Sequence, residues 1–166
     1  MMEPWANRPA EIAHLLNPAF TGAVLRLAVD GYRRESATGM PFSLAFLVLP
    51  FSLHKHTVER LPVKVTSHLQ QWVQDNRDVL LNFQSRMRTL VPYTREGIIF
   101  AGQRQIVTFD ENGLLLPGNK KLFKISAFSA NGISVPETLK RATFMGRWLA
   151  LSGSPTSLYS VLGVTP

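Results

Sequence analysis

The sequence predicts a mainly helical α+β protein, in which a winged-helix-like core with one β-hairpin is flanked by further helices. Apolar residues recur at helical spacing along most of the chain, and several of these stretches begin at a capping residue. Two β-prone stretches, residues 105–109 and 114–116, are joined by a turn that contains Asn112 and Gly113. Because helices precede this hairpin in the order of a winged helix, we expect that arrangement in the middle of the chain.

Two helices are expected at the start of the chain. Asn7 caps a short helix that extends to about Leu16, since a proline follows in the first turn, where its missing N–H is not needed. Asn17 repeats this start signal in front of a second helix over residues 18–35. Residues 42–53 are apolar at nearly every position, so periodicity does not separate a buried strand from a buried helix. We favour a helix here.

Prolines and capping residues divide the middle of the chain. Pro50 is expected to bend or end the helix over residues 42–53, and the polar residues 54–65 are expected to form a loop. Thr66 is predicted to cap one helix, and Asn76 is predicted to cap the next, which Pro92 interrupts. A third helix, over residues 93–103, is expected before the hairpin.

The C-terminal end carries two more helix signals. Ser134 and Glu137 form a capping box in front of a long amphipathic helix. Ser154 begins a short apolar helix that Gly163 ends, and this helix is too short to be stable unless it docks. We expect it to dock on this chain, with a partner chain as the alternative.

The length fits a single domain, residues 1–166. Within it we expect an N-terminal helical lobe over residues 1–65, a winged-helix-like part over residues 66–125 and C-terminal helices over residues 134–166.

Composition narrows the classes of function. The chain has no cysteine, which excludes disulfides, thiolate metal sites and cysteine nucleophiles. The N-terminal residues lack the apolar segment of a secretory signal, and no uncharged apolar run reaches the roughly 18 residues of a membrane span. We therefore expect a cytoplasmic protein with no membrane partner.

No catalytic constellation is found in the sequence. His54 and His56 form one close histidine pair, but no third ligand lies nearby, so a solvated loop is favoured over a metal site. Nucleophile-elbow, phosphate-loop and dinucleotide-binding motifs are absent from the sequence. We predict no enzyme activity, no cofactor and no metal, with a small enzyme of unrecognised type as an open alternative.

The net charge of +7 is concentrated toward the C-terminus, where Glu137 is the one acidic residue after position 111. Lys120, Lys121 and Lys124 directly follow the hairpin, where a winged helix can contact DNA phosphates. The alternative is that these lysines form the exposed face of an amphipathic strand.

Three blocks of sequence resemble one protein family. They are the opening residues 5–20 with Asn7-Arg-Pro-x-Glu11, the middle residues 90–96 (Leu-Val-Pro-Tyr-Thr-Arg-Glu), and the ending residues 144–149 with 154–155 and 162–166. Together they resemble the middle component of bacterial three-component ABC-ATPase systems. The resemblance implies a non-enzymatic adaptor that binds an SMC-like ABC ATPase and a third component, in systems directed against phages or mobile elements. It also implies winged-helix character, and a winged-helix DNA-binding regulator remains the alternative.

The partners expected from the resemblance are the ABC ATPase and the third component, with DNA and a second copy of the chain as further alternatives. Trp5 lies near a chain end that would otherwise fray, and an aromatic residue there suits an interface anchor as well as simple packing. The predicted partner-binding residues lie in the first and last family-like blocks and in the terminal helix. They are Trp5, Asn7, Arg8, Pro9, Glu11, Trp148 and Tyr159.

Overall fold

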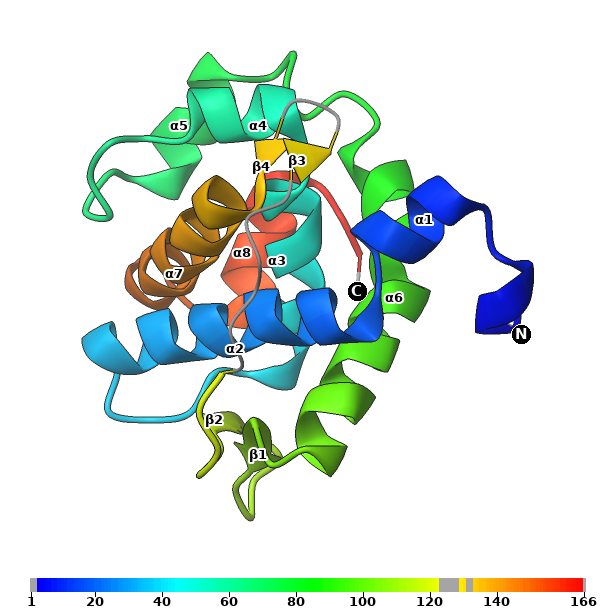
Figure 1. Ribbon diagram of the computed structural model, residues 1–166. Coiled ribbons are helices and arrows are strands. Elements are labelled where there is room, and N and C mark those ends of the chain that lie inside the picture. The colour runs from blue at the N-terminus through cyan, green and yellow to red at the C-terminus, as the bar shows by residue number, and fades with distance from the viewer. Residues whose placement is uncertain (1–2, 123–128, 131–132, 166) are drawn as a thin grey trace.

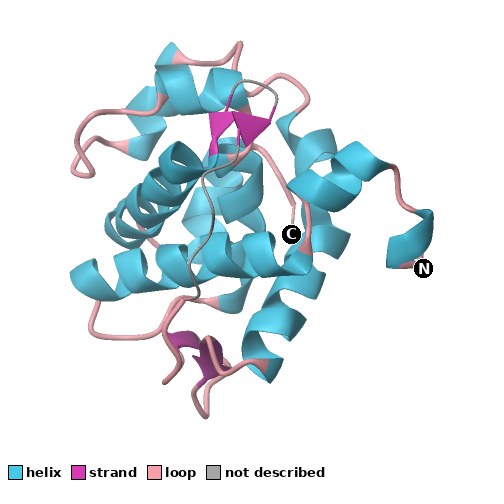
Figure 2. Ribbon diagram, viewed as in Figure 1, coloured by secondary structure: helices cyan, strands magenta, loops and turns pink. Residues whose placement is uncertain are grey.

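In the computed structural model, which describes residues 3–122, 129–130 and 133–165, most of the chain is helical (Figure 2). The helical elements are η1 (Trp5–Asn7), α1 (Ala10–Leu15), α2 (Pro18–Glu35), η2 (Phe42–Leu44), α3 (Ala45–Ser52), α4 (Lys55–Arg60), α5 (Leu69–Asp75), α6 (Phe83–Gln103), α7 (Val135–Leu151) and α8 (Pro155–Leu162). The strands are β1 (Val107–Phe109), β2 (Leu115–Pro117), β3 (Ser129–Ala130) and β4 (Ile133–Ser134).

Helix α2 crosses the middle of the molecule, with α6 near its N-terminal end and α7 packed along it (Figure 1). The predicted start of α2 is confirmed, because the Asn17 side chain accepts a hydrogen bond from the Phe20 backbone N–H at 2.7 Å. Residues from all three predicted parts of the chain contribute to the buried core around this helix.

Glycines allow α2 and α7 to cross with their backbones in contact. A Cβ atom on Gly146 would overlap the Ala28 carbonyl group, and one on Gly31 would overlap the carbonyl oxygen of Thr143. A methyl group at either position would therefore push the two helices apart.

Aromatic side chains join four helices on the other side of the core. The Phe51 ring lies 4.9 Å from the Phe83 ring, and the Trp72 ring lies 5.3 Å from the Trp148 ring, centroid to centroid. The two indole N–H groups each donate to a backbone carbonyl, of Arg60 and of Ser67 respectively, both at 2.7 Å. The aromatic cluster therefore also fixes the segment between α4 and α5.

The predicted β-hairpin is confirmed. Strands β1 and β2 pair antiparallel, with Phe109 opposite Leu115, and Gly113 adopts the left-handed conformation (φ 75°) that the turn requires. The Arg26 guanidinium on α2 donates to the Ile106, Gly118 and Lys120 carbonyls, at 2.5, 3.3 and 3.0 Å. These bonds attach both ends of the hairpin to the central helix.

The predicted C-terminal signals are also confirmed. Ser134 and Ser154 accept hydrogen bonds as caps of α7 and α8, and Gly163 ends α8 with φ 66°. Leu158 and Tyr159 of α8 are buried, and the Tyr159 hydroxyl donates to the Ser43 carbonyl at 2.7 Å. The terminal helix thus docks on its own chain.

Five local predictions were wrong. Neither Asn7 nor Thr66 caps a helix, because α1 begins at Ala10 after Pro9 and α5 begins at Leu69 after His68. Residues 54–65 are not all loop, since they contain α4, and Asn76 ends α5 with its side chain bound to the Trp72 carbonyl at 2.8 Å. Pro92 does not interrupt the helix: α6 runs through it, because buried Met87, Thr94 and Ile98 hold the helix on both sides of the proline. In the described part of residues 66–117, two helices rather than three precede the hairpin, so the winged-helix core is not confirmed.

Residues 10–35, which include α1 and α2, form the one described stretch long and apolar enough to cross a membrane by length and composition. Half of its apolar window is buried inside the protein. Because α2 packs against α6 and α7, the buried apolar side chains of α2 are explained as core residues.

Candidate partner-binding surface

The N-terminal arm, defined as η1 and α1 (residues 5–15), lies on the outer side of α6 (Figure 1). The Arg8 guanidinium donates to both carboxylate oxygens of Glu96, at 2.8 and 2.6 Å, and also lies 5.9 Å from the centre of the Tyr93 ring. The hydrogen bond to Glu96 raises the pKa of Arg8 above its ordinary value. A two-point contact of this kind fixes the orientation of both side chains.

This ion pair joins two of the sequence blocks that suggested a family. Arg8 belongs to the block Asn7-Arg-Pro-x-Glu11, and Glu96 ends the block Leu90-Val-Pro-Tyr-Thr-Arg-Glu96. The two residues are 88 positions apart in the chain. Sequence inspection singled out each block, but the fold alone brings them together.

Helix α1 itself is held weakly. None of its residues is buried, and the Ile12 side chain is 36% exposed. A helix of six residues is unstable in isolation, so α1 depends on the neighbouring Arg8–Glu96 pair for its attachment to α6. The arm is therefore an exposed element whose position is set by few contacts.

A groove of about 470 Å³ lies between α1, the end of α3 and the first half of α6. Its apolar lining comes from Leu15, Leu16, Pro50, Leu53 and Leu90. Its polar lining comes from His54, Asn82, Ser85, Arg86 and Thr89. We call this depression the arm groove.

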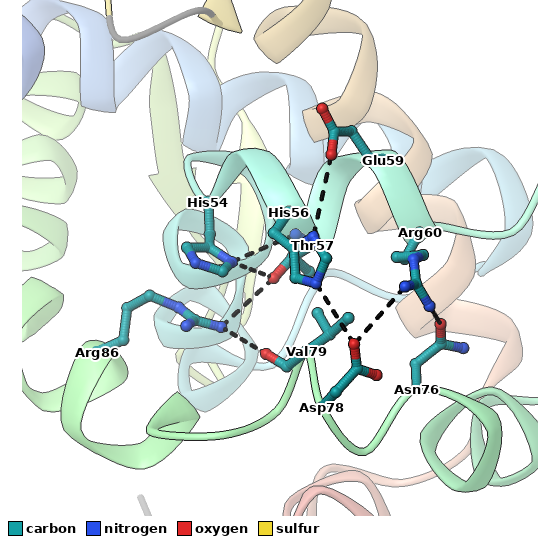
Figure 3. Close-up of polar contacts among 9 residues, drawn as sticks. All are labelled: His54, His56, Thr57, Glu59, Arg60, Asn76, Asp78, Val79 and Arg86. Carbon is teal, nitrogen blue, oxygen red and sulfur yellow. Dashed lines mark hydrogen bonds and ion pairs between the residues drawn. The ribbon is translucent and has the colours of Figure 1, made fainter.

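A polar network lies beside the arm groove (Figure 3). His54 caps α4: its Nδ1 accepts from the Thr57 backbone N–H at 3.3 Å and lies 2.7 Å from the Thr57 hydroxyl. Burial, with the nearby positive charge of Arg86, lowers the pKa of His54, so the ring is neutral at pH 7. His54 is thus a helix cap that also faces the groove.

The second histidine of the pair has a different environment. His56 is exposed and lies 3.4 Å from an Asp78 carboxylate oxygen, which Arg60 approaches at 3.6 Å. These contacts attach α4 to the turns before α6. The described residues contain no group of three or more His, Cys, Asp or Glu side chains placed to hold a metal.

A comparison with known protein families agrees with the resemblance that these sequence blocks show. Residues 5–166 match the model of the family described as ABC-three component (ABC-3C) system Middle Component 3. The chain belongs to the Middle Component 3 family. No curated protein and no solved structure matches the chain.

The arm of this Middle Component 3 protein carries five of the predicted partner-binding residues. Asn7, Pro9 and Glu11 are exposed, whereas Arg8 is engaged with Glu96. Trp5 lies in η1, and its side chain is outside the described part of the structure.

The other two predicted contact residues lie in the protein interior. Trp148 is fully buried and Tyr159 is 4% exposed, and each side chain donates a hydrogen bond within the chain. Their aromatic character reflects core packing, so neither presents a surface to a partner in this structure.

The predicted DNA-binding lysines follow the hairpin. Lys120 and Lys121 are exposed, and neither forms an ion pair within the described residues. Lys124 lies outside the described residues.

No pattern in the sequence indicates the arm groove or the place of Arg86 in it. In the sequence, Arg86 resembles any arginine on an amphipathic helix, and His54 resembles a loop residue. Their shared position depends on how α1, α3 and α6 pack together.

Proposed function

We propose that this Middle Component 3 protein is a non-enzymatic adaptor that binds an SMC-like ABC ATPase and the third component of the same system, in defence against phages or mobile elements. Membership of the family over residues 5–166 supports a place in such a system. The observation that carries the adaptor role is the exposed arm, which the Arg8–Glu96 pair attaches to α6, because an exposed helix that is not part of the core can contact a partner.

The first test is co-expression of the tagged protein with the products of the neighbouring ATPase and third-component genes. Purification followed by size-exclusion chromatography with light scattering should give a complex that contains all three chains. Absence of association with both proteins would overturn the proposal. Salt-dependent binding of the isolated protein to duplex DNA, without that association, would favour the DNA-binding alternative.

Two variants locate the contact on the arm. Ile12→Asp places a charge on the exposed side of α1, and we expect it to weaken the complex roughly tenfold, since apolar groups at interface centres dominate binding. Val63→Asp is the matched control, because Val63 is 96% exposed and lies outside the arm. Equal affinity of the two variants would show that the partner binds elsewhere on the protein.

A further inference from the structure

The half-buried arginines of this protein follow a pattern with one exception. Four of the five form an ion pair with a carboxylate: Arg8 with Glu96, Arg26 with Asp30, Arg141 with Glu137 and Arg147 with Glu35. Arg86 forms none, although all 11 Asp and Glu residues lie in the described part of the chain.

The contacts of Arg86 compensate its charge poorly. One terminal nitrogen, Nη2, donates to the Thr57 hydroxyl and to the Val79 carbonyl, both at the long distance of 3.4 Å (Figure 3). Its Nε is buried and has no hydrogen-bond partner in the described structure. The guanidinium also lies 5.2 Å from the centre of the Phe83 ring. Burial lowers the pKa of Arg86, as expected for a cation removed from water without a counter-ion.

Arg86 lines the arm groove together with His54. Because the His54 Nδ1 accepts from the Thr57 N–H, the neutral ring carries its proton on Nε2, which leaves that N–H free to donate. The groove therefore offers a partly desolvated cation and a neutral donor, with five apolar side chains around them.

We infer that the arm groove binds an acidic side chain, flanked by apolar residues, on a partner polypeptide. A desolvated arginine without a carboxylate is stabilised when a ligand supplies one. The apolar lining from α1, α3 and α6 fits the residues beside that acid better than it fits a free inorganic anion. The groove volume is within the range of about 300–1,000 Å³ typical of binding sites.

This inference rests on the proposed function, because it assigns the polypeptide to the ATPase or to the third component. The groove also touches the arm, because Leu15 at the end of the arm and Leu16 directly after it form part of the groove wall. A peptide in the groove would contact both the arm and α6. Its binding would therefore depend on the position of the arm relative to α6.

The test uses the purified full-length protein and two capped peptides, acetyl-Leu-Glu-Leu-amide and acetyl-Leu-Gln-Leu-amide, titrated in NMR experiments. The glutamate peptide should shift amide signals of residues that line the groove, and the glutamine peptide should bind roughly tenfold more weakly, because a charge-assisted hydrogen bond is lost. Sodium phosphate is the third probe. Phosphate binding at Arg86 as tight as that of the glutamate peptide would overturn the inference in favour of a simple anion site.

Arg86→Gln should reduce binding of the glutamate peptide roughly tenfold and should leave the thermal midpoint unchanged or raised, since an uncompensated buried charge is removed. Arg88→Gln is the matched control: it lies on the same helix, is exposed and does not line the groove. A lowered thermal midpoint with unchanged peptide selectivity would show that Arg86 is structural and overturn the inference. Failure of the three-component complex to form would instead count against the adaptor role alone, because the peptide titration needs no other component.

Discussion

The interface between α2 and α7 and the contact between the N-terminal arm and α6 are built in opposite ways. The first brings backbones together at Gly31 and Gly146 and includes buried residues along both helices. The second has no buried residue on α1 and depends on one bidentate ion pair, Arg8 with Glu96. Both interfaces position a helix, but only the first is continuous with the hydrophobic core.

If the arm binds a partner as proposed, the difference separates the residues that stabilise the fold from those that serve recognition. Close packing tolerates almost no change, because any added atom must displace a backbone. The Arg8 side chain is only 7% exposed, but no residue of α1 is buried beside it, so the arm can open and re-form without disturbing the core. We therefore expect substitutions at the α2–α7 crossing to affect folding, and substitutions in the arm to affect local order and binding.

The largest effect is expected at the helix crossing. Gly146→Ala places a methyl group on the Ala28 carbonyl, and we expect a loss of about 3 kcal/mol in the free energy of unfolding, measured by urea denaturation. Gly102→Ala is the matched control, since a Cβ atom there meets nothing within 4 Å, and stability should change by less than about 1 kcal/mol. Similar losses in the two variants would show that the crossing is not closely packed.

An intermediate effect is expected at Asn17, where the arm joins the central helix. Asn17→Ala removes the side chain that accepts from the Phe20 N–H, and we expect a cost of about 1 kcal/mol in the same measurement. Asn17→Ser keeps a capping oxygen and should be nearly neutral. An equal loss in the serine variant would point to a role other than capping.

The smallest effect on global stability is expected in the arm. Glu96→Gln keeps the shape of the side chain but removes the charge that holds Arg8, so residues 5–15 should exchange amide hydrogens faster, as measured by mass spectrometry. The urea midpoint should barely move. Glu111→Gln, in the exposed hairpin turn, changes the net charge equally and should leave arm exchange unaltered. A large loss of global stability in Glu96→Gln would contradict the contrast between the two interfaces.

Family membership was predictable because the blocks that carry it are continuous stretches of sequence, and the match over residues 5–166 confirmed it. Contact residues were harder to predict from residue type. Trp148 and Tyr159 have the chemistry of interface anchors, yet a large aromatic side chain with one polar atom suits a core equally well when a backbone carbonyl accepts its proton.

The sequence by itself determined the elements whose signals are local. The caps at Asn17, Ser134 and Ser154, the stop at Gly163 and the turn at Gly113 each depend on the type and spacing of a few adjacent residues, which the sequence alone displays.

Tertiary structure decided the rest. Pro92 stays helical because distant side chains bury both sides of α6, and residues 54–65 contain a helix because His54 caps it beside α6. The Arg8–Glu96 pair and the uncompensated Arg86 depend on which helices become neighbours. Burial and charge compensation are properties of that surrounding structure, and so no local pattern in the sequence encodes them.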